Sequence, residues 1–289
     1  MARWREWGAA WLFVLPAALA LLALRVLPAA TALWDSFHKP SVFDPDDIRF
    51  AGLDNYRFLL ADSPTFLPAL RVTFVFVAVT VAVQTLLALL LALLFTRNGP
   101  GMRVWRTVVF LPITVPTAVS AVVWGTALRG DGLLNAVLAR LHLPPQPFLA
   151  SASQALPSVV LIASWIGVGY WMMFLVAGLR DVPADVLEAA SIDGAGPLRR
   201  FFSVTLPLLV RPLAFVVVAN TVANFLQFVP AAILTQGGPQ DSTRFVMFEI
   251  YSQAYVQGDT ALASAEIVVV LLVLLAIVGV QFRLLRARA

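Results

Sequence analysis

The chain has 289 residues, of which 60% are hydrophobic and only 12% are charged, and its mean hydropathy is +0.87. Soluble domains carry about 25% charged residues, so this composition excludes a soluble enzyme, a nucleic-acid-binding domain and a disordered chain. The 20 basic residues exceed the 16 acidic ones, but they are scattered at the ends of apolar stretches and form no block. The composition therefore predicts an all-α, polytopic membrane protein.

Six apolar stretches are long enough to cross a bilayer, which takes about 20 helical residues. Backbone groups in lipid must be hydrogen-bonded internally, so each stretch is predicted to be a helix. The predicted spans are approximately 9–33, 67–95, 104–128, 155–179, 212–235 and 263–282, in one transmembrane domain that covers residues 1–289 and includes a cytoplasmic loop at 180–211. Prolines such as Pro112 and Pro116 are expected to kink or end the helices in which they lie.

Clustered arginines flank three segments that are predicted to be cytoplasmic, and the loop after the second span has no acidic residue beside them. They are Arg3 and Arg5 before the first span, Arg97, Arg103 and Arg106 after the second, and Arg283, Arg286 and Arg288 after the sixth. By the positive-inside rule, both termini are expected in the cytoplasm, which fits an even number of spans. The alternative for the N-terminus is a signal peptide cleaved near residues 30–32; Arg25 and Pro28 interrupt the apolar run and disfavour it.

Several kinds of site are excluded because the residues they need are missing. The chain has no cysteine and two widely separated histidines, so neither a metal site nor a thiolate nucleophile is expected. The one lysine, Lys39, follows histidine rather than glycine, so the chain has no ATP-binding P-loop. A helical rise of about 1.5 Å per residue places Arg25, Arg71 and Glu266 near the outer face. No ionisable group is then expected at the bilayer centre, which disfavours an ion-coupled transporter and a membrane-embedded enzyme.

The loop 180–211 is too polar to enter lipid and too patterned to be a flexible linker. It holds four acidic residues and four arginines. Pro183 suits the first turn of a short helix, and Gly194 and Gly196 permit a sharp reversal with positive φ. A second short helix is predicted to begin at Pro197. Small residues around the reversal let another protein's backbone approach closely, so we predict a docking segment.

This loop resembles the EAA loop that marks the transmembrane subunits of binding-protein-dependent ABC importers. The similarity rests on Glu188-Ala189-Ala190, Asp193-Gly194-Ala195, Phe202, Leu206-Pro207 and Pro212. Three external segments are similar to the carbohydrate (maltose or glycerol-phosphate) branch of these importers. They are Gly52-Leu53-Asp54-Asn55-Tyr56, Gly132-Leu133-Leu134-Asn135, and Thr235-Gln236-Gly237-Gly238-Pro239 with Ser242-Thr243, the last of which resembles the first of the two permease subunits. Glu266 departs from the pattern, in which a small or apolar residue is expected.

The resemblance implies a type I ABC importer permease fold with six transmembrane helices and a cytoplasmic coupling helix, in a bacterial inner membrane. It implies a transport subunit rather than an enzyme, with no bound cofactor, because ATP and Mg are used by a separate subunit. The implied partners are a homologous second permease, two copies of an ABC ATPase, an extracytoplasmic solute-binding protein or lipoprotein, and membrane lipid. The residues expected to contact the ATPase are Glu188, Ala189, Ala190, Asp193, Gly194 and Ala195.

Polar and aromatic side chains at mid-depth are candidates for the solute pathway, because polar groups that face lipid are costly. They are Asn220, Asn224 and Gln227 in the fifth span, Trp165, Tyr170 and Trp171 in the fourth, and Gln84 in the second. The spacing i, i+4, i+7 of the fifth-span amides predicts one stripe of a helix. Amides can bond to hydroxyl groups, and aromatic faces can stack on sugar rings. The alternative is that the amides join helices and the aromatic residues pack.

We therefore predict that the chain forms half of an ATP-driven pathway for a sugar or sugar-like solute. Oligosaccharides, trehalose, monosaccharides and glycerol-3-phosphate-like solutes all remain open. A permease for a non-carbohydrate solute and an ion-coupled transporter are kept as alternatives.

Overall fold

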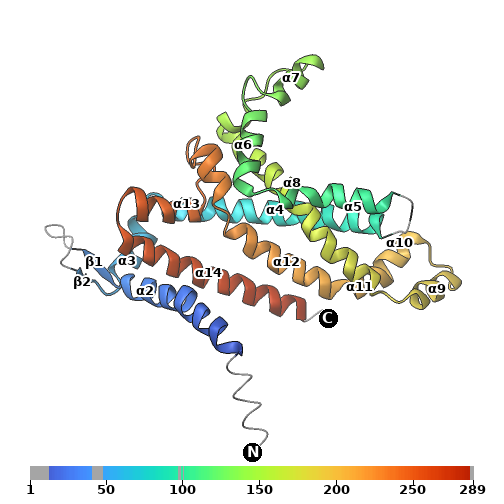
Figure 1. Cartoon of the computed structure of the whole chain (residues 1–289), viewed down its shortest axis with the longest axis horizontal. Coiled ribbons are helices and arrows are strands. Elements are labelled where there is room, and N and C mark those ends of the chain that lie inside the picture. Colours follow the sequence, from blue (N-terminus) through green and yellow to red (C-terminus); the bar gives the residue numbers. More distant parts are fainter. Residues whose placement is uncertain (1–12, 41–47, 97–98, 100, 287–289) are drawn as a thin grey trace, which may run out of the picture. The chain divides into compact units, whose positions relative to one another are not determined.

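The computed structural model describes residues 13–40, 48–96, 99 and 101–286 (Figure 1). These residues are mostly helical, and a short antiparallel hairpin pairs β1 (His38–Pro40) with β2 (Ile48–Phe50). They group into two compact units. The first lies within Met1–Leu67 and Ile250–Leu272, and the second within Pro68–Glu249 and Val273–Ala289.

Four unbroken helices are long and apolar enough to cross a membrane. They are Phe13–Asp35, α4 (Phe66–Phe95), α8 (Ala152–Arg180) and Thr260–Leu284 within α14 (Thr260–Arg286). Two bent helix pairs qualify when each is taken as one span, namely Met102–Thr114 with Thr117–Ala127, and Pro197–Leu208 with Val210–Phe225. The described residues therefore hold four to six candidate spans, all of which overlap the predicted ones. Residues 9–12 of the predicted first span lie outside the described residues.

The third predicted span is bent by 97°. It runs through α5 (Met102–Phe110) and η3 (Leu111–Thr114), and α6 (Thr117–Ala127) follows after an extended residue at Pro116. Because proline lacks a backbone N–H and clashes with the preceding turn, it ends the first helix here, as expected.

The fifth predicted span, 212–235, is not one helix. α12 (Val210–Phe225) begins earlier than expected, after a bend of 68°, and ends ten residues sooner. A separate turn, η6 (Ala231–Thr235), follows it. The segment that leads into α12 consists of α9 (Ala184–Ile192), α10 (Pro197–Arg200), η5 (Phe201–Thr205) and α11 (Leu206–Leu208).

The core of the second unit forms where α4, α8 and α12 pack together. It contains Ala88, Ala92, Phe95, Trp171, Met172, Leu175, Val176, Leu179, Leu209 and Val216. Glycines on α8 allow close approach: a Cβ on Gly178 would lie 2.6 Å from the ring of Pro212, and one on Gly169 would overlap the carbonyl group of Val109. Backbones therefore touch where a larger side chain would hold the helices apart.

In the first unit, the external motif around Asn55 closes a loop. The buried Asn55 side chain donates hydrogen bonds to the carbonyl oxygens of Ser36 (2.8 Å) and His38 (2.9 Å), and the hydroxyl of Tyr56 bonds to that of Ser36. These contacts join α3 (Asp54–Arg57) to β1 and to the end of α2 (Leu27–Asp35). The other short helices of this unit are η1 (Leu22–Val26), η2 (Phe58–Asp62) and η7 (Ser252–Val256).

In the second unit, Asn135 has the same role. It lies on α7 (Leu133–Arg140), and its side chain bonds to the carbonyl oxygens of Arg129 and Gln146 and accepts from the backbone N–H of Gln146. η4 (Phe148–Ala150) then leads into α8. The hairpin, α7 and the short α13 (Val246–Tyr251) were not predicted from the sequence.

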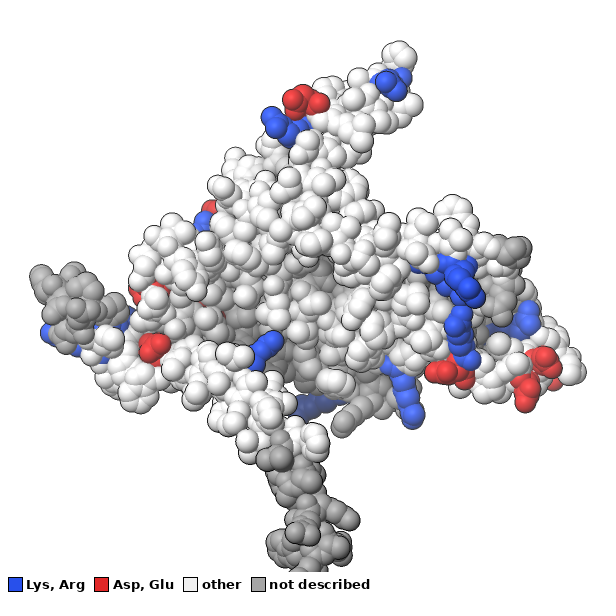
Figure 2. Space-filling model, viewed as in Figure 1, with Lys and Arg blue, Asp and Glu red and all other residues white. Residues whose placement is uncertain are grey.

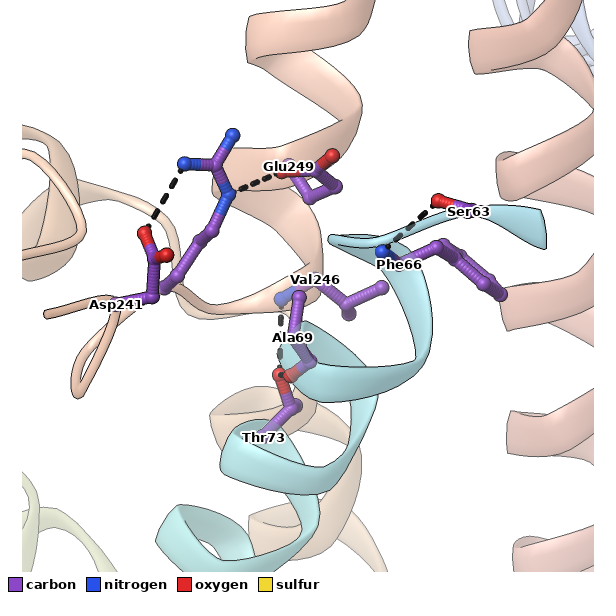
Figure 3. A network of polar contacts seen from close by, with 8 residues as sticks. Ser63, Phe66, Ala69, Thr73, Asp241, Val246 and Glu249 are labelled. Carbon is purple, nitrogen blue, oxygen red and sulfur yellow. Dashed lines mark hydrogen bonds and ion pairs between the residues drawn. The ribbon is translucent and has the colours of Figure 1, made fainter. Parts of the chain in front are cut away.

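The third external motif is also held together by polar contacts within the second unit. The hydroxyl of Thr243 bonds to that of Thr235 (2.6 Å) and donates to the carbonyl oxygen of Gly238. Val246 then donates its backbone N–H to the hydroxyl of Thr73, which fixes α13 against α4 (Figure 3). All three external motifs are thus loop closures.

Candidate functional site

The coupling segment is the part of the second unit between α8 and α12. Its first helix, α9, is fully described and has no buried residue. Ile192 and Leu198 are 87% and 77% exposed. Phe202, at 62%, is also exposed, so the segment presents several large apolar side chains to the outside among charged residues. Such a surface is typical of a contact with another protein.

The reversal after α9 is built on Gly194, whose φ is +75°. The backbone N–H groups of Asp193, Gly194 and Ala195 bond back to carbonyl groups at the end of α9, at 2.9–3.1 Å. Only glycine adopts this backbone conformation without a steric cost. The prediction for Gly196 is wrong, because its φ is −65° and it precedes α10 as an ordinary extended residue.

The predicted contact residues surround this reversal. Glu188, Ala189, Asp193 and Gly194 are exposed, and Ala190 and Ala195 are half-buried. Behind them, the guanidinium of Arg200 donates to the hydroxyl of Ser191 at 2.5 Å, and that hydroxyl donates to the carbonyl oxygen of Leu187. The segment is therefore held in shape from within and has an open outer face.

Three of the predicted pathway residues form one buried amide cluster, which we define as Gln84, Asn220 and Asn224. The Asn224 amide donates to Gln84 Oε1 at 3.2 Å and to Asn220 Oδ1 at 2.5 Å. Gln84 in turn donates to the carbonyl oxygen of Ala163 at 2.8 Å. The cluster connects α4, α12 and α8. Two of its hydrogen bonds cross between helices and two remain within α12, so in this conformation the amides do join helices.

One donor in the amide cluster has no acceptor. The Nδ2 group of Asn220 is buried and has no hydrogen-bond partner among the described residues. An unsatisfied buried donor costs about 1–3 kcal/mol, and such groups in native structures are candidates for a functional role. Asn220 can therefore donate to a further group without breaking an existing bond.

Gln227 does not belong to this cluster, and its place in the predicted helical stripe is wrong. α12 ends at Phe225, and Leu226 caps it with φ −87° and ψ 12°. Gln227 thus follows the helix, half-buried, and the i+7 spacing no longer describes one face. Helix ends are not visible in an apolar run that continues past them.

The predicted aromatic residues on α8 separate into two settings. Trp165 is 42% exposed and lines a cavity of about 640 Å³ between α4, α5 and α8. The buried hydroxyl of Ser164, which has no partner among the described residues, lies on the same cavity wall. Tyr170 stacks edge-on against Trp171 at 4.9 Å, and Trp171 belongs to the buried core. Tyr170 is 38% exposed, so of the two partly exposed aromatic residues only Trp165 lines this cavity.

An ion-pair cluster that was not predicted from the sequence lies after the third external motif. Arg244 bonds to the buried Glu249 and, at 3.2 Å, to Asp241 (Figure 3). Burial lowers the pKa of Arg244, but its hydrogen bonds to the two carboxylates and their charges outweigh this, so the pKa is raised. The sequence feature that could have indicated this ion pair is Glu249, five positions after Arg244. It lies on α13, a helix that was not predicted.

The comparisons with known proteins agree with this architecture. Residues 84–289 match the model of the family described as "Binding-protein-dependent transport system inner membrane component". The chain belongs to this family. It is therefore a permease component of an inner membrane, and its relatives are transport subunits.

Two curated relatives match this permease over nearly its whole length. The sn-glycerol-3-phosphate transport system permease protein UgpA of Agrobacterium fabrum is 33% identical over 96% of the chain and 94% of its own length. The probable ABC transporter permease protein YesP of Bacillus subtilis is 30% identical over 95% of the chain and 89% of its own length.

The fold of the permease also matches a solved structure. A bacterial ABC transporter involved in the import of the acidic polysaccharide alginate superposes with a TM-score of 0.82, at 20% identity, over 99% of both chains. The predicted fold class, an all-α permease of an ABC importer, is thereby confirmed.

Proposed function

We propose that this permease forms half of the transmembrane pathway for a sugar or sugar-like solute and is driven by a separate ATPase through α9. Its partners would be a homologous second permease, two ATPase subunits and an extracytoplasmic solute-binding protein. The observation that carries the proposal is the coupling segment. Hydrogen bonds within the segment fix its shape, and α9 has no buried residue. The sequence has no P-loop, so ATP hydrolysis would need another subunit. The family description supports the binding-protein partner.

The coupling role follows from the shape of the segment. α9 is short and has no buried residue, and its end is fixed by the Gly194 reversal. The segment continues through α10, η5 and α11 directly into α12, which holds Asn220 and Asn224. A push on α9 would therefore be transmitted to the helix that carries most of the amide cluster. We assign the contact with the ATPase to Glu188, Ala189, Ala190, Asp193, Gly194 and Ala195.

The coupling assignment is tested with two aspartate variants in the assembled transporter. Gly194→Asp forces a β-carbon into the left-handed region, and Gly196→Asp places the same side chain two residues away, at a φ that any residue adopts and at a favoured N-cap position. We expect Gly194→Asp to lose solute-stimulated ATPase activity and uptake, and Gly196→Asp to keep most of both.

Both variants should be compared for co-purification of the ATPase in mild detergent. Equal activity of the two variants would contradict the coupling role of the reversal. A chain that purifies without an ATPase and transports solute in vesicles without ATP would overturn the importer proposal as a whole.

The solute class rests on the cavity beside Trp165. The cavity offers an exposed indole face and an unpartnered hydroxyl at Ser164, which are suited to a sugar ring and its hydroxyl groups. Asn220, which is buried outside this cavity, has a further unpartnered amide donor. The relative from Agrobacterium fabrum is named for sn-glycerol-3-phosphate, which supports a small polyhydroxyl solute. We keep Asn220, Asn224, Gln84 and Trp165 as pathway residues, with Tyr170, Trp171 and Gln227 as flanking candidates.

Trp165→Leu tests the cavity directly. Because this indole is 42% exposed, its loss should leave folding intact while uptake at low solute concentration falls several-fold. Trp105→Leu is the matched control, since Trp105 lies on α5, is 59% exposed and does not line that cavity. Equal uptake by the two variants would remove Trp165 from the pathway.

We also propose that both termini and the coupling segment lie in the cytoplasm. The absence of cysteine from the sequence makes this simple to test, because single cysteines can be placed at will. A cysteine at the exposed Ser191 should be labelled only from the inside, and one at the exposed Leu141, after α7, only from the outside. The reverse pattern would invert the topology.

A further inference from the structure

A basic pocket lies at the end of the second unit where α5 begins and α8 ends. Arg103, Arg106 and Arg180 line a cavity of about 310 Å³ together with the apolar side chains of Phe110, Met173 and Val176. Arg103 and Arg106 are one turn apart on α5, and Arg180 is the last residue of α8. Three guanidinium groups from two helices thus converge on one cavity.

Two of the three arginines in this pocket have no partner in the described part of the protein. Arg106 is anchored, because its guanidinium donates through Nε (2.7 Å) and Nη2 to the carbonyl oxygen of Phe95 at the end of α4. The side chains of Arg103 and Arg180 make no hydrogen bond or ion pair with any described residue, and no carboxylate lines the cavity. Like charges that share a site repel one another, so an anion in the pocket would relieve this repulsion.

The pocket is polar at one end and apolar at the other. Phe110 and Met173 are each seven residues further into their helices than Arg103 and Arg180, so they lie about 10 Å deeper at the helical rise. Figure 2 shows a group of basic side chains with both white surface and acidic side chains beside it. In a membrane crossed by α8, the guanidinium groups would lie at the level of the lipid headgroups and the apolar wall at the level of the upper acyl chains.

We infer that this pocket binds the phosphate of an anionic phospholipid, with the glycerol and upper acyl chain against Met173 and Val176. Guanidinium groups bind phosphate oxygens through paired hydrogen bonds, and basic pockets between transmembrane helices are suited to lipid headgroups. The positive-inside rule asks only for positive charge at a helix end. It does not require three arginines around a cavity with an apolar wall. The inference does not depend on which solute is transported.

The test uses the full chain purified in a neutral detergent. Its thermal unfolding and its bound lipid, by native mass spectrometry, are measured with added phosphatidylglycerol, phosphatidylcholine or inorganic phosphate. We expect phosphatidylglycerol to bind at one saturable site and to raise the unfolding midpoint, and phosphatidylcholine to do neither. Equal effects of the two lipids would overturn the inference. Protection by inorganic phosphate alone, equal to that by phosphatidylglycerol, would assign the pocket to a soluble phosphate and overturn the lipid as its source.

Matched variants locate the site. Each arginine near an anionic lipid surface contributes favourable binding free energy. The double variant Arg103→Gln with Arg180→Gln should therefore weaken phosphatidylglycerol binding about thirtyfold. Arg140→Gln, which removes one charge from α7 outside the pocket, should not weaken it. The charge-preserving pair Arg103→Lys with Arg180→Lys controls for folding and should retain part of the affinity.

The apolar wall is tested separately. Met173→Gln should weaken lipid binding several-fold without changing any response to inorganic phosphate, since it removes contact with the acyl chain only. Unchanged phosphatidylglycerol binding in the double glutamine variant, with the chain still folded, would place the lipid elsewhere and overturn the assignment.

Discussion

Two glycines show how differently the helix core and the coupling segment use the same residue. Gly169 on α8 is buried, and a Cβ there would overlap the backbone of α5 at Val109. Gly194 is exposed, and nothing among the described residues lies within 4 Å of the position that a Cβ would occupy. The first glycine is required for space between two helices, and the second for a backbone angle. A substitution of Gly169 should therefore lower the stability of the whole second unit, whereas a substitution of Gly194 should change only the coupling segment.

The same contrast holds for the polar groups. The amide cluster is buried and joins three helices, so its bonds contribute to the stability of the second unit. The polar contacts of the coupling segment, such as Arg200 with Ser191, are exposed and remain within a few residues of the reversal. The segment that we propose contacts the ATPase thus has its shape fixed by local hydrogen bonds, and its outer face is exposed.

The largest effect should come from Gly169→Ala. The added methyl group meets backbone rather than a flexible side chain, so α5 and α8 must separate, at a cost of about 3 kcal/mol or more. We expect a strongly lowered thermal midpoint and poor yield of folded protein. Gly279→Ala on α14, where nothing described lies within 4 Å, is the control and should be nearly neutral. An unchanged midpoint for Gly169→Ala would show that these helices are not in backbone contact.

The next effect concerns the amide cluster. Asn224→Leu removes the amide that donates to the side-chain oxygens of Gln84 and Asn220. The loss of these hydrogen bonds should lower the free energy of unfolding by about 1–2 kcal/mol. Asn220→Leu also removes a donor that is already unsatisfied, so its cost should be smaller. The comparison of thermal midpoints by tryptophan fluorescence decides the order. If Asn220→Leu proved the more damaging variant, its Nδ2 group would have a partner that this conformation does not show.

The general architecture could be predicted from the sequence because lipid imposes a simple rule. Runs of about 20 apolar residues must form helices, and four such runs are unbroken helices here. The bend near Pro116 was also foreseeable, since proline cannot continue a helix. The exact end of α12 at Phe225 was not, because it falls five residues before Pro230, the residue expected to kink or end this span.

The candidate site was only partly predictable for a related reason. Spacing placed Asn220 and Asn224 on one face of a helix, but no pattern within one span could show that Gln84 of another span would accept the hydrogen bond. The external motifs were recognisable, yet their role as loop closures depends on partners such as Ser36 and Gln146, which lie 11–19 residues away. The periodicity of a sequence predicts which residues share a face of one helix, but it does not predict contacts between separate segments.

A smaller and local effect is expected for Gly194→Ala. An alanine in the left-handed region costs about 1 kcal/mol, so local opening of the reversal should become about fivefold more frequent. Limited trypsin cleavage after Arg199 and Arg200 measures this opening, and the thermal midpoint of the whole chain should stay the same. Gly196→Ala, at φ −65°, is the control. A lowered global midpoint for Gly194→Ala would show that the coupling segment is part of the core.

The smallest effect should come from Arg200→Gln, which removes the exposed hydrogen bond to Ser191. Exposed contacts of charged side chains contribute about 0.5 kcal/mol or less, so amide hydrogen exchange at the end of α9 should rise about twofold and no further. Arg199→Gln is the matched control, because Arg199 is the adjacent exposed arginine and its side chain makes no hydrogen bond or ion pair with the described residues. A tenfold rise for Arg200→Gln alone would mean that this bond, rather than the Gly194 reversal, fixes the orientation of α9. The experiment would thus rank the Arg200–Ser191 hydrogen bond and the Gly194 reversal by their contributions to the structure of the segment, in which α9 has no buried residue.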